Sequence, residues 1–327
     1  MMNPDAHRPS QAVYSPAATF AAQGEIAFEW RGKLALSRQD QIAVAGGSFA
    51  RQLGASLRAA GLGLLDAEPA PDGAPFAAAQ DYGYGQFSAR FGRIDSARLF
   101  AQVLDDAATG FVSPRYVWHQ NGRYVDAFRP WIEPGGMVSV AEVLALRRHH
   151  LAAVKRLFRQ ADCLILTLGA GEYWLEPDTG RAFPLRPDEL AGAVDPAQLL
   201  RQRPERAVVA ADLALLRRQV TQLNPQLRMV LSVSPQRADE GRAGSAVLSA
   251  VRDFAAAHPE IDYFPAAEIA DHHRLARWQG FAAPETGTSD AVISAFLRGY
   301  GLDNLAPQHR IGQAEGPGAL GRGGAGG

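Results

Sequence analysis

The sequence of 327 residues is poor in the features that mark several protein classes. It has one cysteine, Cys163, which excludes an internal disulfide and a cysteine-ligated metal centre. Cys163 lies within the apolar run 162–168, so we expect a core position. No run of about 18 apolar residues is present, and the first residues lack the apolar stretch of a secretory signal. From these absences we expect a cytoplasmic protein without a membrane span.

Ligand motifs and charge excess are also missing. With 33 basic and 34 acidic residues the net charge is −1, so we expect no nucleic-acid partner. The pairs Gly61/Gly63 and Gly83/Gly85 lack the third glycine and the strand-to-helix context of a dinucleotide site. There is no phosphate loop ending in Gly-Lys-Ser/Thr, and no His, Asp and Glu cluster has metal-ligand spacing. We therefore expect no cofactor and no metal.

What the sequence does contain is a regular alternation of strand and helix patterns, typical of an α/β protein with a doubly wound, mostly parallel sheet. Its 47% hydrophobic content is ample for one large domain. The predicted strands are 41–46, 163–168, 228–233 and 261–265, and the predicted helices are 49–60, 140–160, 206–223, 245–257 and 289–300.

The domain organisation follows from where this alternation stops. Residues 1–22 predict a flexible arm, and the glycine-rich segment 303–327 predicts a disordered tail, leaving one domain at 23–302. Within this domain, residues 62–139 interrupt the alternation of strands and helices. This stretch predicts an insertion or cap, with a hairpin around Asn121 and Gly122. Its aromatic residues suit either the insertion's own small core, which we favour, or a substrate-facing wall. They are Trp118, Tyr124, Phe128 and Trp131.

Ser48 stands where the first strand stops at two glycines and a helix begins. Phe49, Leu53 and Leu57 recur at helical spacing directly after it. A hydroxyl at this junction would lie at the carboxyl edge of the sheet, where helix N–H groups stabilise negative charge. The sequence leaves two interpretations open: Ser48 is a nucleophile, or it is a helix N-cap.

Several segments now point to a known family. Ala45-Gly-Gly-Ser-Phe-Ala50 resembles the signature of the GSCFA domain, which is grouped with SGNH-type (GDSL-like) hydrolases. Segments 122–136, 168–174, 231–235 and 261–268 agree with it in the same order. The resemblance implies a flavodoxin-like α/β fold with an inserted cap, and ester hydrolysis or O-acyl transfer, with acylated carbohydrate as an implied substrate class. It also implies a small-molecule or glycan acyl ester as the partner.

The sequence departs from that pattern around the predicted nucleophile. Gly47-Ser48 replaces the Ser-Cys pair, which puts serine at the position of the nucleophile in GDSL-type enzymes. The oxyanion-hole asparagine is missing, because Gly169-Ala-Gly171-Glu172 has no side-chain amide. We expect backbone N–H groups of Ser48, with Gly85 or Gly171, to hold the oxyanion. The predicted oxyanion and substrate-binding residues are Gly47, Gly85, Gly169, Gly171, Glu172, Arg129 and Ser234.

The catalytic base is the second departure. SGNH-type enzymes carry Asp-x-x-His before the last helix, where this chain has Gly287. The nearest replacements are His272 and His273, with Glu268 four or five residues earlier as an orienting group if the segment is helical. The alternative is a solvated pair of surface histidines. Three other histidines are weaker candidates: one of His149 and His150 suits a structural role on helix 140–160, and His119 adjoins the hairpin.

Two hypotheses from different classes result. In the first the chain is a serine esterase or acyltransferase. In the second it is a catalytically degraded relative that binds a glycan or acyl ligand, as the missing histidine and asparagine suggest. Whether the chain is an enzyme, and its oligomeric state, do not follow from the sequence.

Overall fold

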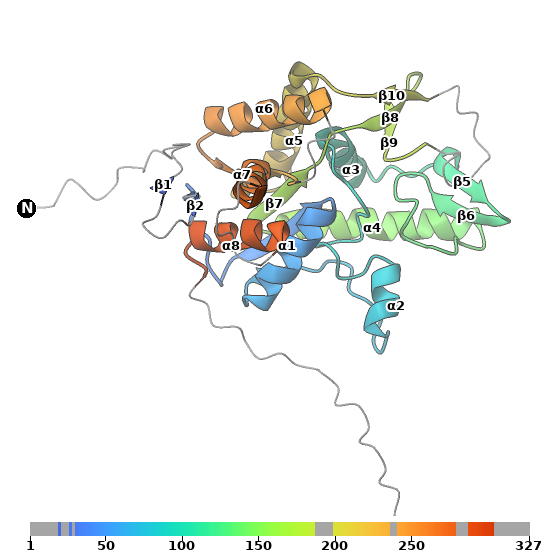
Figure 1. Ribbon diagram of the computed structural model, residues 1–327. Helices are drawn as coiled ribbons and strands as arrows, with labels where there is room; N and C mark the ends of the chain where they lie inside the picture. Colours follow the sequence, from blue (N-terminus) through green and yellow to red (C-terminus); the bar gives the residue numbers. More distant parts are fainter. Residues whose placement is uncertain are drawn as a thin grey trace, which may run out of the picture.

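The computed structural model describes residues 19–20, 26–27, 30–186, 199–235, 241–278 and 287–303. At its centre is a five-stranded parallel sheet (Figure 1). The strands lie in the order β12 (Ile261–Phe264), β11 (Arg228–Val233), β7 (Cys163–Leu168), β3 (Gln41–Gly46) and β4 (Gly63–Leu64). In chain order this is 2-1-3-4-5, the flavodoxin-like arrangement. The predicted fold class is therefore confirmed.

The central strands are covered on both faces, as their continuous apolar runs predicted. All six residues of β7 are buried, including Cys163. Burial raises the pKa of the Cys163 thiol to about 12, so this thiol belongs to the core and is unreactive at neutral pH.

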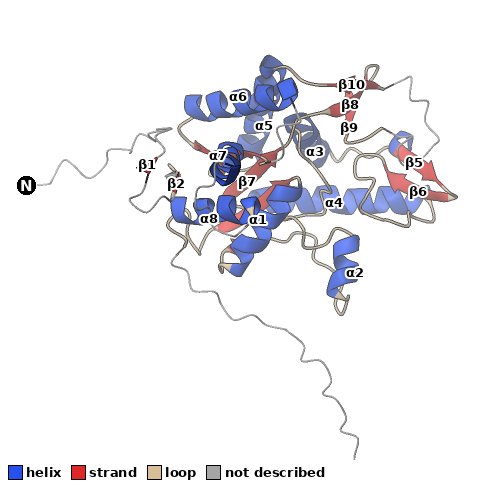
Figure 2. Cartoon of the chain, viewed as in Figure 1, coloured by secondary structure: helices blue, strands red, loops and turns tan. Residues whose placement is uncertain are grey.

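Two groups of helices sandwich the sheet (Figure 2). One group consists of α1 (Ser48–Ala59), α7 (Ala266–Trp278) and α8 (Thr288–Gly299), with α8 packed on both others. The other group consists of α3 (Ala97–Thr109), α4 (Val140–Gln160), α5 (Arg206–Leu223) and α6 (Gly241–Ala257). The predicted helices are found within a few residues of their expected bounds. Among the described residues, no helix is long and apolar enough to cross a membrane.

The prediction that 62–139 is one insertion needs correction, because part of it belongs to the main fold. The stretch begins with the edge strand β4 and contains α3, which packs against α4 and α5. The buried residues Leu99, Phe100, Val103 and Leu104 give α3 its apolar face, and Gly110 ends it with φ of 72°. The short helix α2 (Phe76–Asp81) and residues 111–139 lie outside the sheet and helix layers (Figure 1).

The predicted hairpin is confirmed. Strands β5 (Val117–Gln120) and β6 (Arg123–Asp126) flank Asn121 and Gly122, whose φ values of 48° and 77° suit the tight turn of a two-residue hairpin. Of the four aromatic residues considered above, Trp118 and Phe128 pack into a second, smaller core, as favoured, whereas Tyr124 is half-buried outside it and Trp131 is 38% exposed. That core also takes Phe183 from an antiparallel sheet that was not predicted, formed by β10 (Leu200–Gln202), β8 (Tyr173–Glu176) and β9 (Arg181–Phe183).

The chain ends contribute little to the described structure. Trp30 packs on Phe264, Phe296 and Tyr300, and so fixes the segment before β3 to the sheet and α8. Before it, β1 (Thr19–Phe20) pairs with β2 (Ile26–Ala27). Otherwise the predicted arm at 1–22 lies outside the described residues, as does the predicted tail from 304 onward.

Candidate functional site

The candidate site lies at the carboxyl ends of β3 and β7. The strand order reverses between these two neighbours, and ligands of open α/β sheets bind at such a switch point. Gly46 ends β3 with φ of 140° and lies against Thr167, so closely that a side chain would overlap with the Thr167 backbone oxygen and hydroxyl. Glycine at this position lets the chain pass from β3 into α1 within two residues.

Ser48 is the first residue of α1 and is half-buried. The N-cap is Gly47, so the alternative that Ser48 caps the helix is wrong. Within the described residues no side chain caps α1, and its first turn has no acidic residue. The N–H groups of that turn lie at the positive end of the helix dipole, which favours a bound or developing anion.

A third segment reaches this point by running along the free edge of β3 beyond the end of β4. The Ser88 N–H donates to the Val44 oxygen at 3.1 Å, and the Ile94 N–H donates to the Gly46 oxygen at 3.3 Å. The next residue, Asp95, accepts a hydrogen bond of 2.7 Å on its backbone oxygen from the N–H of Gly169. Asp95 is thereby fixed between the ends of β3 and β7.

The Asp95 carboxylate lies over the two glycines that end these strands. A β-carbon at Gly169 would be 3.1 Å from Asp95 Oδ2, and one at Gly47 would be 3.8 Å from it. A larger residue at Gly169 would displace the carboxylate, which gives that predicted glycine a structural reason, whereas a β-carbon at Gly47 would make an ordinary van der Waals contact with Asp95. Asp95 itself was not predicted. Its one local signal is its position directly before Ser96, the N-cap of α3, and α3 was missed as well.

Two hydroxyls at the same edge lack hydrogen-bond partners among the described residues. They are Thr167 Oγ1 in β7 and Ser234 Oγ directly after β11, and both are buried. The Ser234 N–H donates to the Leu168 oxygen at 2.7 Å, which ties the end of β11 to that of β7. Ser234 therefore lies at the predicted edge. Buried polar groups without partners are rare, and they are found at sites that take a ligand or water.

Glu172 follows the two glycines after β7, but its carboxylate is engaged by side chains. Arg201 and Arg203 each donate to it at 2.6 Å. Burial opposes ionisation of Glu172, but the two arginines outweigh it and lower the pKa of this carboxyl below its usual value. A substrate that bound Glu172 would have to compete with both arginines.

His273 lies at the carboxyl edge of the sheet. Its Nδ1 is 3.4 Å from the hydroxyl of Thr288, the first residue of α8. The other end of α8 meets the amino end of β12, where the Tyr300 hydroxyl donates to Asp262 at 2.9 Å. Thr288 must therefore lie at the opposite edge, as Ser48 does. His273 thus adjoins Gly287, where the family pattern has its histidine.

The remaining residues of α7 differ from expectation. His272 is half-buried beside His273. The Glu268 carboxylate, predicted to orient one of these rings, accepts hydrogen bonds of 2.6 and 2.8 Å from the Tyr263 hydroxyl. Arg274 pairs with Asp271 at 2.7 Å and donates to the Pro235 oxygen, which holds α7 against the end of β11.

Two predicted site residues lie elsewhere. The Gly85 oxygen accepts a bond of 3.4 Å from Arg58, in the last turn of α1, whereas Ser48 begins that helix. The Arg129 side chain is 2% exposed, pairs with Asp126 at 3.0 Å and donates to the Arg90 oxygen. Gly85 therefore lies beside the end of α1 that is far from Ser48, and the Arg129 side chain is too enclosed to reach a substrate. Neither residue suits the role predicted for it.

The family follows from comparison with known proteins. The model of the GSCFA family matches residues 41–296, which is most of the chain and includes every residue of the site above. The chain belongs to the GSCFA family. Searches of curated proteins and of solved structures each gave no match. Within the described part of this GSCFA protein, no group of three or more His, Cys, Asp or Glu side chains is placed to hold a metal ion.

Proposed function

We propose that this GSCFA protein is a serine-dependent ester hydrolase or O-acyltransferase of SGNH type, with Ser48 as its nucleophile. One observation carries the proposal: Ser48 begins α1 at the switch point, where the first-turn N–H groups follow a glycine N-cap that supplies no side chain. These groups are suited to the negative charge that develops on a carbonyl oxygen under attack.

The reaction would proceed in two steps. Ser48 Oγ attacks the carbonyl carbon of the ester, its proton passes to a base, and the carbon–oxygen bond to the leaving alcohol breaks as that alcohol takes up the proton. Water or an acceptor hydroxyl then attacks the acyl-serine and restores Ser48. Backbone N–H groups of α1 and of Gly171 would hold the oxyanion in both steps.

Two side chains are candidates for the base. His273 lies at the edge where Ser48 lies and adjoins the start of α8, next to the glycine that replaces the family-type histidine. Asp95 lies over Gly47, the residue before the nucleophile. An imidazole base and a carboxylate base predict a different pH dependence of labelling. The pH at which labelling of Ser48 is half-maximal should therefore discriminate between them.

Labelling with a fluorophosphonate probe, followed by peptide mass spectrometry, tests the proposal. We expect the label on Ser48 in the wild type and none in Ser48→Ala. Ser56→Ala, two turns later on the same helix, is the matched control and should label normally. A folded wild type that is not labelled at any pH would refute the proposal.

The second candidate is a catalytically degraded protein that binds a glycan or acyl ligand at the same edge. It is favoured by Gly287, which replaces the family-type histidine; among the described residues, a β-carbon there would have the Asp290 carboxylate within 4 Å. This candidate predicts thermal stabilisation by the ligand in both wild type and Ser48→Ala, without a covalent intermediate.

A further inference from the structure

Helix α4 carries an excess of positive charge. Its one acidic residue, Glu142, lies in the first turn, and residues 143–160 contain five arginine or lysine residues and no acidic one. One of the five, Arg147, is buried and pairs with Asp106 and Asp126. The other four form what we call the basic stripe: Arg148, Arg156 and Arg159 are exposed, and Lys155 is half-buried. Because the whole chain has a net charge of −1, this excess is local to α4.

The basic stripe lies on the face of α4 that is turned away from the core. Arg148, Lys155 and Arg159 recur at a spacing that puts them on one side of a helix. The stripe is about 16 Å long, given a rise of about 1.5 Å per residue. The opposite side of α4 is buried in the main core through residues such as Leu151 and Phe158. α4 is therefore amphipathic, and its apolar side is already occupied.

The described acidic residues do not neutralise the stripe. Within the described part of the chain its four residues form no ion pair, and the side chain of Arg156 donates one bond of 3.5 Å to the Ala67 oxygen. Two carboxylates near α4 are engaged elsewhere: Glu68 is buried beside His150, and Asp162 accepts a bond of 2.8 Å from the backbone of β3. The charge of the stripe is therefore available to a partner outside the chain.

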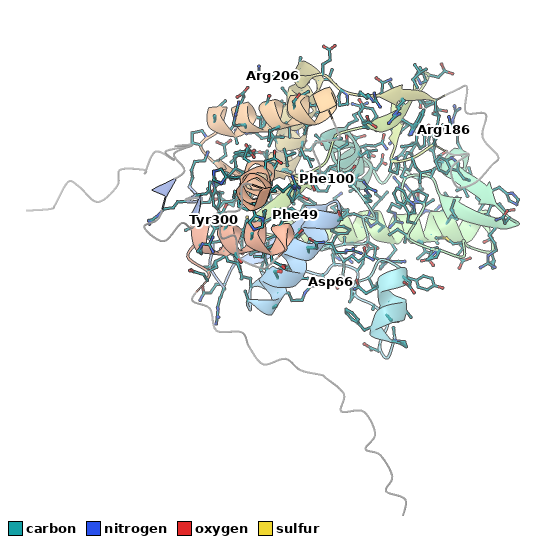
Figure 3. The ribbon with its side chains drawn as sticks, in the orientation of Figure 1. Phe49, Asp66, Phe100, Arg186, Arg206 and Tyr300 are labelled. Carbon is teal, nitrogen blue, oxygen red and sulfur yellow. The ribbon has the colours of Figure 1, made fainter. Side chains whose placement is uncertain are left out.

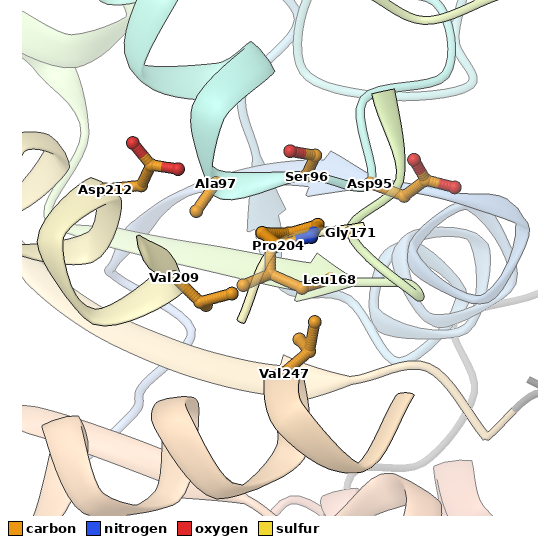
Figure 4. Close-up of a pocket in the computed structure, with 9 residues that line it drawn as sticks. All are labelled: Asp95, Ser96, Ala97, Leu168, Gly171, Pro204, Val209, Asp212 and Val247. Atoms are coloured by element: carbon orange, nitrogen blue, oxygen red, sulfur yellow. The ribbon is translucent and has the colours of Figure 1, made fainter. Parts of the chain in front are cut away.

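Solvent-exposed arginines on α5 are paired, by contrast. Arg206 and Arg217 each pair with a carboxylate, and the buried Asp212, beside the small pocket shown in Figure 4, has Arg98 at 3.8 Å. The macrodipole of α4 accounts for cations in its last turn, but Arg148 lies about three turns before the end of the helix. Neither pairing within the described chain nor the dipole explains the stripe.

We propose that the basic stripe binds this protein to an anionic phospholipid surface. A basic amphipathic helix binds either a membrane surface or a groove that takes its apolar side. Burial of the apolar side of α4 excludes the groove and leaves contact through the charged face. The exposed residue within the stripe is the small Ala152, so the cations can approach a flat layer of headgroups together. The one Phe, Tyr or Trp residue of α4, Phe158, is buried and cannot stack on nucleic-acid bases.

Co-sedimentation with lipid vesicles tests the proposal. The wild type should bind vesicles in which a third of the lipid is phosphatidylglycerol but not vesicles of phosphatidylcholine alone, and added salt should release it. Arg148→Gln/Arg159→Gln should bind about 25-fold more weakly, because each arginine contributes about 5-fold. The matched control, Arg206→Gln/Arg217→Gln, changes the net charge equally and should bind as the wild type does.

The outcomes decide between lipid and other partners. Equal binding of the wild type and the Arg148/Arg159 variant would overturn the proposal, as would equal binding, or none, to the two kinds of vesicle. Binding to a DNA duplex at a salt concentration that releases the protein from phosphatidylglycerol would also overturn it, because the partner would then be nucleic acid. Ser48→Ala should bind the vesicles like the wild type, so this test does not depend on the proposed ester chemistry.

Discussion

Two regions of this protein use their buried polar groups in opposite ways. Between α3, α4 and β6 lies a buried ionic cluster, consisting of Asp106, Asp126, Arg129, Arg147 and Arg181 (the region is seen with side chains in Figure 3). Arg147 bridges Asp106 at 2.6 Å and Asp126 at 3.3 Å. At the switch point, by contrast, the buried hydroxyls of Thr167 and Ser234 have no hydrogen-bond partner among the described residues, and the N-cap of α1 is a glycine.

The difference distinguishes polar groups that stabilise the fold by pairing with each other from polar groups that can bind a ligand. In the ionic cluster each charged group faces an opposite charge, and the pKa of Asp126 is lowered: burial opposes its ionisation, but Arg147 and Arg129 outweigh that effect. Such pairs hold elements together and leave nothing for a ligand. The switch point has fewer charges, yet it combines unused donors with glycines that keep space around Asp95. A strongly charged buried cluster is thus not by itself a site.

Removing Ser48 should have the largest effect on activity and almost none on the fold. Ser48→Ala should lower kcat/KM on the order of 1,000-fold or more, because the nucleophile is lost. Its unfolding free energy should change by less than about 0.5 kcal/mol, since alanine suits the first turn of a helix. Ester turnover and urea unfolding of the same preparation measure both. A large loss of stability in this variant would mean that the switch point is structural after all.

Removing the Arg147 side chain should have the opposite result: a large loss of stability and little direct effect on activity. Arg147→Met leaves Asp106 and Asp126 buried with fewer partners, so the unfolding free energy should fall by about 3–5 kcal/mol. The control is Arg148→Met on the next, exposed position of α4, which should change it by less than about 0.5 kcal/mol. If the folded Arg147 variant lost activity without losing stability, the ionic cluster would have a functional role that we do not assign to it.

The buried pair of His150 and Glu68 should make stability depend on pH. His150 is fully buried, with Nδ1 2.6 Å from Glu68, which confirms the expected structural histidine. Burial, aided by Arg129, lowers the pKa of His150 from 6.5 to about 4 despite Glu68. The folded protein therefore keeps His150 neutral, whereas the unfolded chain takes up a proton below about pH 6.5, so stability falls as the pH is lowered toward 4.

Between pH 6.5 and 5 this loss should be about 2 kcal/mol, measured by urea unfolding at each pH. Glu68 contributes little in that window, because its stabilisation is lost only as the pH falls from about 4.5 toward its lowered pKa of about 2. His150→Gln should flatten the dependence, and His149→Gln, at the exposed neighbouring position, should not. Equal pH dependence in wild type and His150→Gln would rule out this assignment.

Crowding Asp95 should have the smallest effect. In Gly169→Ala the new β-carbon would lie 3.1 Å from Asp95 Oδ2, so the carboxylate must shift. We expect kcat/KM to fall about 10-fold, with a stability loss of about 1 kcal/mol. Adding Asp95→Ala to this variant should cause less further loss than Asp95→Ala causes in the wild type. Additive losses would mean that Gly169 and Asp95 act independently.

The fold followed from local patterns wherever these were strong. The strands at 41–46, 163–168 and 228–233 were predicted at their observed bounds, because their apolar runs end at glycine or polar residues. α3 was missed because the glycines and prolines around it suggested irregular structure. The hairpin at Asn121 and Gly122 was found because its turn needs these residue types.

The site was predicted only in part, and the reason is the sequence separation of its members. Ser48, Gly169 and Ser234 each follow a strand, so their meeting at one edge could be expected from the topology. Asp95 reaches that edge through the backbone bond of its neighbour Ile94 to Gly46 and its own bond to Gly169, and no local sequence pattern predicts such contacts. The same holds for Glu68 and His150, which are 82 positions apart, and for Arg129, whose partners were unknown from the sequence.

The most direct test of the central claim is to trap the acyl-enzyme. The wild type is mixed with an excess of acetyl ester, quenched in acid within the first turnover and digested for peptide mass spectrometry. We predict an acetyl group on Ser48 that disappears on a longer incubation after the ester is consumed. Continuous turnover with no acetyl on Ser48, or with acetyl on another residue, would contradict the account.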